Sequence, residues 1–248
     1  MNLVSLATLL PSSIVAGAMK MNFGGMLYDL CMGFGVTLKL FALTLLIALP
    51  LGFVFAFLSI TKLKPISIIM KTIIWVVRGT PLLLQCIIVT FIPSVVFKVK
   101  NTDFAAMLGI DSMVDLQFFF VLIAFAINYA CYFAVIYEGG IKNVSRGQHE
   151  AGQVLGMTKW QIFRHVVLMQ VIRKISAPMS NEIITLVKDT ALARALSVLE
   201  IIAIAYEKVN KYAVLSPLLY AALFYLLFSG VLTIAFHYME KKLSYYSV

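Results

Sequence analysis

The sequence has few charged side chains and none of the motifs of hydrolytic enzymes. Only 12% of its 248 residues are Asp, Glu, Lys or Arg, against 62% hydrophobic residues, and the mean hydropathy is +0.97. This composition excludes an ordinary water-soluble domain. A P-loop pattern, an HExxH pattern and a Ser, His and acid set with recognisable spacing are all missing. We therefore expect an integral membrane protein that carries out no hydrolysis itself.

Cysteine and histidine are also scarce. Cys31, Cys86 and Cys131 each lie alone in an apolar stretch, and no CxxC pair suggests metal or redox chemistry. His149 and His165 lie in the most polar part of the chain, outside the apolar stretches. The sequence predicts neither a metal site nor an intramembrane catalytic centre.

Five apolar stretches are each long enough to cross a membrane as a helix, which takes roughly 20 mostly apolar residues. Alternating segments of the barrel type are absent, so helices are expected. The stretches lie near residues 28–60, 66–97, 118–140, 175–200 and 213–239. The predicted fold class is an all-α integral membrane protein with about five transmembrane helices.

The first residues are apolar, but no basic region precedes them as it would in a signal peptide, and the first lysine is Lys20. We expect residues 1–27 to form an interfacial N-terminal segment. Residues 28–248 are then the transmembrane domain.

The distribution of charge predicts the orientation. Residues 141–174 carry six Lys or Arg against one acid, Glu150, whereas residues 98–117 carry three aspartates against two lysines. The positive-inside rule places the first segment in the cytoplasm and the second outside. Basic pieces at residues 62–64 and 241–242 agree with N outside and C inside. The net charge of +9 then belongs to a cytoplasmic rim facing anionic lipid, which argues against nucleic-acid binding.

The polar segment from 141 to 174 has a helix–glycine–helix pattern. Residues 150–155 form a helical turn or two, Gly156 interrupts them, and Thr158 with Gln161 has the spacing of a capping box that opens a second helix. An apolar stripe follows at Ile162, Phe163, Val166 and Val167. Two interpretations stay open: a connector lying on the inner leaflet, or a protruding element that docks a cytoplasmic partner.

Three motifs carry a family resemblance. "EAGQVLG" is similar to the EAA loop of ABC-transporter permeases, with matches at Glu150, Ala151 and Gly156, and with Gly152 in place of the second alanine. "RGTPLLLQ" (78–85), "GGIKNVSRGQHEAGQVLGMT" (139–158) and "KDTALARALSVLEI" (188–201) resemble the polar amino-acid importer branch of these permeases. The resemblance covers about residues 33 to 240.

The resemblance implies a permease of the type I importer fold in a bacterial cytoplasmic (inner) membrane, moving a small polar amino acid by alternating access. Its implied partners are a second permease, the same or different, two copies of a cytoplasmic ATP-binding subunit, an external solute-binding protein and membrane lipid. ATP and Mg would bind the ATPase, and this chain would bind no cofactor. An ion-coupled secondary transporter is the alternative.

The EAA-like loop would then couple to the ATPase through Glu150, Ala151, Gly152 and Gly156. Glu150 would pair with a basic group of the ATPase or cap a nearby helix, and Gly156 would permit a tight bend. Gly152, in place of alanine, would add flexibility and remove a methyl group from the docking surface.

The predicted substrate pathway begins at Arg78 and Thr80. Thr80 is a good N-cap and Pro81 suits the first helical position, so the helix should break there. A new helix N-terminus favours an anionic group such as the carboxylate of an amino acid. The alternative is that Arg78 extends to an interface and the break is a packing kink.

The fourth stretch is the most polar. Glu182 and Asp189 are seven residues apart and share a helix face, and with Lys188 they could bind the ammonium and carboxylate groups of an amino acid. A buried ion-pair network that holds two permeases together is the alternative. Asn128, in the third stretch, is expected to bond a neighbouring helix.

The chain departs from the family in "ACYFAVIYEGG", where Val135 replaces a usual glutamate and Glu138 replaces a usual arginine. This departure favours either an altered substrate preference or a heterodimer whose other half supplies the missing charge.

Overall fold

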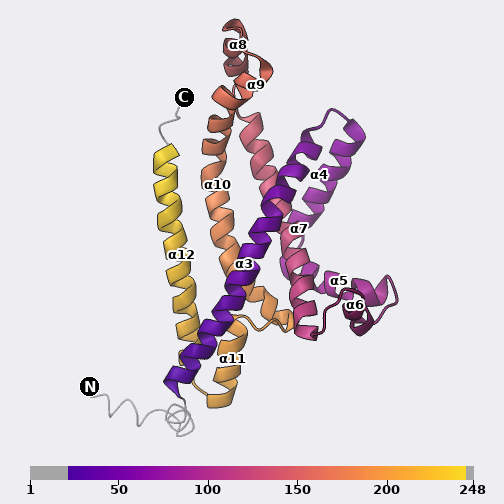
Figure 1. Cartoon of the computed structure of the whole chain (residues 1–248), viewed down its shortest axis with the longest axis vertical. Coiled ribbons are helices and arrows are strands. Elements are labelled where there is room, and N and C mark those ends of the chain that lie inside the picture. Colours follow the sequence, from indigo (N-terminus) through magenta and orange to yellow (C-terminus); the bar gives the residue numbers. More distant parts are fainter. Residues whose placement is uncertain (1–21, 244–248) are drawn as a thin grey trace, which may run out of the picture.

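The computed structural model describes residues 22–243, and within this range every regular element is helical (Figure 1). Residues 1–21 of the expected interfacial segment lie outside the described residues, and residues 23–27 are the first of helix α3. The elements are α3 (Phe23–Ile60), α4 (Lys64–Arg78), α5 (Leu82–Val95), α6 (Asn101–Met107), α7 (Met113–Lys142), α8 (Arg146–Val154), α9 (Lys159–Ile162), the π-helix η1 (Phe163–Val167), α10 (Leu168–Asp189), the 3-10 helix η2 (Thr190–Leu196), α11 (Ile201–Tyr212) and α12 (Ser216–Leu243).

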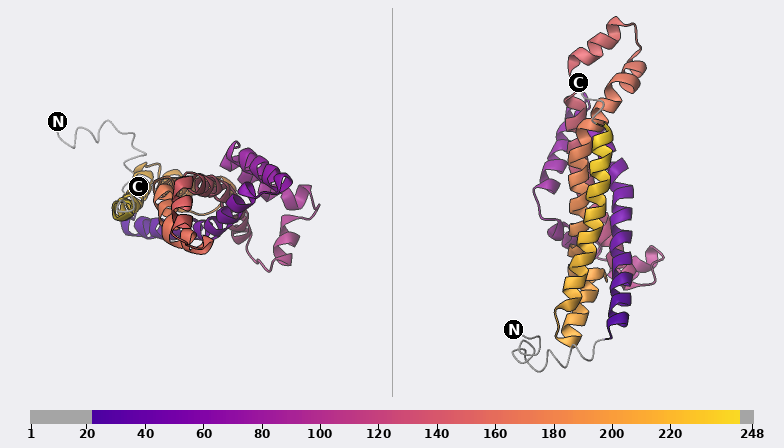
Figure 2. Two further views of the ribbon diagram at one scale, coloured as in Figure 1. Left: turned by 90° about the horizontal axis from the view of Figure 1, so that it is seen from above. Right: turned by 90° about the vertical axis from the view of Figure 1, so that its left-hand side faces the viewer.

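The long helices correspond to the five predicted stretches, but two stretches are not straight. By length and composition α3, α7 and α12 can each cross a membrane, and α4 with α5 makes a fourth span if that pair, bent by 109°, is counted as one. The helix α10 lies alongside α12 (Figures 1 and 2). It is too polar to count as a span by composition alone. The fourth stretch was predicted to continue to residue 200, but α10 ends at Asp189 and is followed by the 3-10 helix η2.

The centre of the bundle is the crossing of α3 and α7. A Cβ atom on Gly52 of α3 would lie 2.8 Å from the carbonyl oxygen of Ala130 and from Cβ of Phe133, both on α7. A glycine at this point lets the two backbones approach closely, which is how membrane helices gain packing energy without a hydrophobic driving force. Leu40, Val121, Phe125 and Leu186, among others, complete the buried core.

The two kinds of charged segment lie in opposite halves of the bundle. The turn between α3 and α4, the segment containing α8 and α9, and the end of α12 lie in one half, and the segment around α6 lies in the other (Figure 1). The basic half is the half that the positive-inside rule assigns to the cytoplasm. The orientation itself remains a prediction.

Candidate functional site

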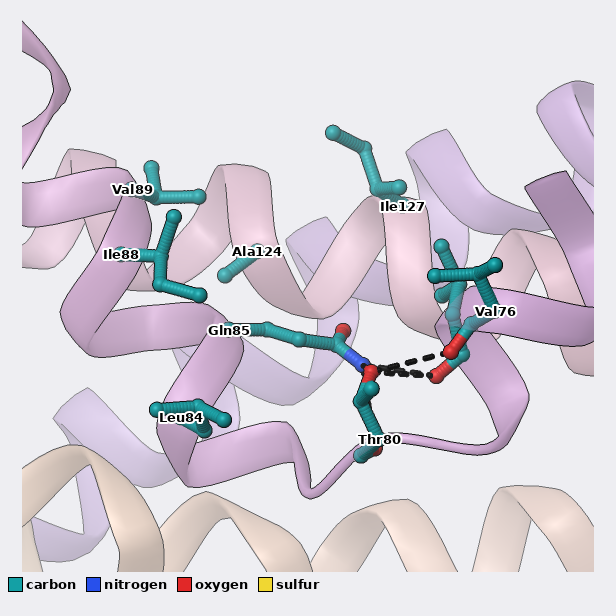
Figure 3. A pocket seen from close by; sticks show the side chains of 9 residues that line it. Val76, Thr80, Leu84, Gln85, Ile88, Val89, Ala124 and Ile127 are labelled. Atoms are coloured by element: carbon teal, nitrogen blue, oxygen red, sulfur yellow. Dashed lines mark hydrogen bonds between the residues drawn. The ribbon is translucent and has the colours of Figure 1, made fainter.

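The side-chain amide of Gln85 forms hydrogen bonds across the break between α4 and α5 (Figure 3). Pro81 has no N–H to donate, and Nε2 of Gln85 donates instead to the carbonyl oxygens of Val77 (2.7 Å) and Thr80 (3.1 Å) and to the Thr80 hydroxyl (2.8 Å). The predicted break is therefore confirmed. The predicted cap is wrong, because Pro81 is the N-cap residue of α5. The Thr80 hydroxyl is directed to the preceding helix α4, where it can donate to the carbonyl oxygens of Val76 and Val77.

Gln85 also joins the break to α7. Its Oε1 accepts a hydrogen bond of 3.0 Å from Nδ2 of Asn128, so the prediction that Asn128 bonds a neighbouring helix is confirmed. An apolar pocket of about 280 Å³ lies beside Gln85, in the angle between α4, α5 and α7 (Figure 3). Gln85 and Thr80 line this apolar pocket. Thr80 also lines a second, polar pocket, together with Asn128.

The second pocket, called here the polar cavity, has a volume of about 430 Å³ and combines residues from the break, α7, α10 and η2. It is lined by Thr80, Pro81, Leu82, Asn128, Tyr129, Tyr132, Glu182, Thr185, Asp189 and Leu192. The Tyr129 hydroxyl donates to Oδ2 of Asp189 over 2.7 Å, which fixes one carboxylate on the cavity wall. Three of the predicted pathway residues, Thr80, Glu182 and Asp189, therefore line the same cavity.

Two other predicted pathway residues lie differently. The Arg78 guanidinium lies 4.9 Å from the ring centre of Tyr132, which lines the polar cavity, so Arg78 lies at the edge of the cavity and is not part of its lining. Lys188 is exposed and does not line the cavity. Within residues 22–243 none of Glu182, Lys188 and Asp189 forms a salt bridge in this chain, so an ion-pair network would need a second permease.

Sequence reasoning missed Tyr129, Tyr132 and Glu200. The two tyrosines follow Asn128 in "NYACY", and a polar group at this spacing on one face of an apolar stretch was the available signal. Glu200 is fully buried, and its carboxylate caps the start of α11. An acid just before the apolar run "IIAIA" was the available signal there.

Glu138, one of the departures from the family pattern, lies away from the polar cavity. It pairs with Lys142 on the same helix, and it accepts a hydrogen bond of 2.7 Å from the Ser59 hydroxyl at the end of α3. Glu138 therefore ties α3 to α7 and does not contribute to the lining of the cavity.

The segment from α8 to α9 projects beyond the bundle (Figures 1 and 2). Gly156 ends α8 with φ +71°, the left-handed conformation that favours glycine. The amides of Gly156 and Met157 donate to the carbonyl oxygens of Gln153 (2.9 Å) and Gly152 (3.0 Å), which is the hydrogen-bond pattern of a Schellman motif. The predicted glycine bend is confirmed.

The predicted capping box is also confirmed. The Thr158 hydroxyl accepts from the amide of Gln161, and the Gln161 side chain accepts from the amide of Thr158. Glu150 does not cap α9. Glu150 and Ala151 are both exposed on α8.

The prediction that Gly152 faces an exposed docking surface is wrong. This residue is buried, and a Cβ atom there would lie 2.7 Å from Cγ1 of Ile162 on α9. The methyl group of an alanine at this position would lie between α8 and α9, against Ile162. It would not lie on an exposed docking surface. Gly152 makes the segment tighter because the Ile162 side chain fills its space.

The exposed surface of this segment is apolar at its tip. The side chains of Val154, Leu155 and Trp160 are 88%, 78% and 66% exposed. The Trp160 ring also packs on Phe163, with 5.7 Å between ring centres. Large exposed apolar side chains on a rigid turn are typical of a protein interface.

Comparisons with known proteins identify the family of this chain. Residues 48–245 match the family model of the binding-protein-dependent transport system inner membrane component. The arginine transport system permease protein ArtQ of Bacillus subtilis is 31% identical over 85% of this chain and 90% of its own length. The L-cystine transport system permease protein TcyB of the same organism is 30% identical over 86% of each chain.

Solved structures give the same result for the fold. A crystal structure of an amino acid ABC transporter with histidines matches 90% of this chain and 99% of its own, with a TM-score of 0.71 and 26% identity. The inward-facing MetNI methionine ABC transporter matches with a TM-score of 0.64 at 16% identity, which supports the fold alone.

The chain therefore belongs to the family of binding-protein-dependent transport system inner membrane components, as a permease of the amino-acid ABC importer type. Permeases of this family are transport components of the membrane. The ion-coupled alternative receives no support from these relatives.

Proposed function

We propose that this chain forms the translocation pathway for a polar amino acid, with the polar cavity as its substrate site, and that a separate ATPase drives its alternating access. The observation that carries the proposal is the meeting of Thr80, Glu182 and Asp189 with two tyrosines in one cavity of about 430 Å³. A cavity of this size is suitable for a small polar molecule.

The chemistry of the lining favours a substrate with an ammonium group. Glu182 and Asp189 offer two carboxylates, and Arg78 at the edge offers a cation for the substrate carboxylate. Two acids against one cation give the site a net negative charge. A cationic amino acid fits that balance best, which agrees with the similarity to an arginine permease.

The segment from α8 to α9 is the proposed contact with the ATPase. Glu150 and Ala151 are exposed beside the apolar tip, and Gly156 with the capping box at Thr158 keeps the two short helices at a fixed angle. A rigid turn can transmit a displacement, whereas a flexible connector would absorb it. Gly152 supports this rigidity from inside the segment.

The remaining parts of the proposal follow from this role. The working assembly contains this permease, a second permease that is the same or different, two ATP-binding subunits and an external solute-binding protein. ATP and Mg bind the ATPase. The assembly lies in a bacterial cytoplasmic membrane among its lipids, with the α8–α9 end in the cytoplasm.

Uptake by the purified assembly in proteoliposomes tests the proposal. We expect ATP-dependent accumulation of a radiolabelled amino acid, with unlabelled arginine competing more strongly than glutamate. ATP on the side of the α8–α9 segment should be required, and an ion gradient without ATP should drive no uptake. Accumulation that follows an ion gradient and ignores ATP would overturn the proposed function.

A further inference from the structure

One carboxylate, that of Glu200, is buried outside the lining of the polar cavity. Glu200 is the only Asp, Glu, Lys or Arg that is buried within residues 22–243, at 0% exposure. Its Oε1 accepts from the amide of Ala203 (2.7 Å), and its Oε2 accepts from the amide of Ile202 (2.8 Å) and from the Tyr225 hydroxyl (3.2 Å). A buried carboxylate is costly unless hydrogen bonds compensate it, and these three bonds do so.

Tyr225 connects this carboxylate to the cavity. Its hydroxyl lies 3.2 Å from the hydroxyl of Thr190, the first residue of η2, and Thr190 follows Asp189 directly in the chain. On the far side of the cluster the Thr37 hydroxyl of α3 accepts from the amide of Ile201, the first residue of α11, over 3.3 Å. The Glu200 cluster, formed by Glu200, Tyr225, Thr190 and Thr37, therefore joins α3, η2, α11 and α12 next to a proposed substrate ligand.

Little of the helix α12 is buried within residues 22–243. Only 6% of its most apolar stretch is buried, and its buried residues are Pro217 and Ala221. Aromatic contacts of Phe224 and Phe228 with α3 add packing, and apolar packing is less directional than a hydrogen bond. Since lipid is as apolar as these side chains, a hydrogen bond between helices adds a directional constraint on their register.

We propose that Glu200 and Tyr225 are positioning residues of the transport cycle, which make α11 and α12 follow the cavity wall when a substrate engages Asp189. Neither side chain lines the cavity, and both act through Thr190 and the segment 190–200. The inference rests on the proposed function, because it needs a substrate at Asp189. It adds a route by which substrate binding in the cavity changes the position of α12.

The test uses the full assembly in proteoliposomes with Tyr225→Phe, which keeps the ring and removes only the hydroxyl. We expect the half-saturating amino-acid concentration for uptake to rise about threefold to tenfold, the range that one interhelical hydrogen bond in a membrane produces. ATP hydrolysis without substrate and the yield of assembly should not change. Thr190→Val should have a similar effect.

Tyr238→Phe is the matched control, since Tyr238 is an exposed tyrosine on the same helix. Adding Glu200→Gln to Tyr225→Phe should cost less than the two separate effects combined, because Tyr225→Phe removes the hydrogen bond that Glu200→Gln weakens by taking the charge from its acceptor. If Glu200→Gln yields no assembly, Tyr225→Phe and Thr190→Val decide the question.

Two results would overturn the inference while the proposed function stands. In one, Tyr225→Phe behaves like Tyr238→Phe while the parent transports normally. In the other, the variant lowers yield, basal ATP hydrolysis and uptake in proportion, which indicates a purely structural role. A parent assembly that transports no amino acid would refute both the proposed function and this inference.

Discussion

Replacing Gly156 by proline is expected to abolish the stimulation of ATP hydrolysis by substrate. Gly156 has φ +71°, whereas proline is fixed near −65°, and its amide donates to the carbonyl oxygen of Gln153, a bond that proline cannot make. The Schellman motif would be lost and α9 would point elsewhere. The spans are not touched, so membrane insertion should be unchanged. ATP hydrolysis by the purified assembly, with and without substrate, measures the effect.

Gly156→Asn is the control at the same position. Asparagine adopts the left-handed conformation more readily than other residues with a side chain and keeps the amide donor, so coupling should be largely retained. Normal substrate stimulation in Gly156→Pro would refute the role of the α8–α9 segment as a rigid coupling element. If both variants lose the stimulation of ATP hydrolysis by substrate, coupling depends on the small side chain at position 156 and not on its backbone conformation.

Replacing Asp189 by asparagine is expected to reduce uptake efficiency about tenfold to a hundredfold without dissociating the assembly, since hydrogen bonds to charged groups are among the strongest. Asparagine can still accept the hydrogen bond from the Tyr129 hydroxyl, so the wall of the cavity should keep its shape. Only the negative charge facing the substrate ammonium is removed. Initial rates of uptake over a range of substrate concentrations measure the effect.

Asp111→Asn is the matched control, because it makes the same chemical change at an exposed position outside the polar cavity. It should leave uptake unchanged. If Asp189→Asn instead makes the assembly fall apart at normal levels of the chain, Asp189 belongs to an ion-pair network between two permeases and not to the substrate site.

Much of the fold could be predicted because its signals are local. The apolar stretches gave α3, α7 and α12 to within about five residues at each end, and the pattern around Gly156 and Thr158 gave the turn between α8 and α9. The break before α5 was also local, because proline lacks the amide that a continuous helix needs. In each case the residues that decide the structure are neighbours in sequence.

The rest depends on contacts between distant residues. Whether Gly152 faces a partner or its own molecule depends on Ile162, ten positions away across a turn, and the sequence pattern alone gave the wrong answer. The π-helix from Phe163 to Val167 was not predicted, since no residue type marks one. The position of Thr80 depends on Gln85.

The polar cavity illustrates the same limit. Glu182 and Asp189 could be assigned to one face because the helical period is fixed, and the structure brings both to the cavity. Lys188 was grouped with them by composition, although it is one residue from Asp189 and therefore points elsewhere on the helix. The spacing of Tyr129 and Tyr132 puts them on one face of α7, but their place in the cavity wall depends on the packing of α7 against α10.

The most direct test of the account is to ask which protein copurifies with this chain through the α8–α9 segment. The parent and a Leu155→Glu, Trp160→Glu variant would be extracted from the native membrane in mild detergent and analysed by mass spectrometry. We predict a P-loop ATPase with the parent and its loss with the variant, because both substitutions put a charge on the exposed apolar tip. Equal recovery of the ATPase with both chains, or its absence from a well-folded parent, would contradict the account.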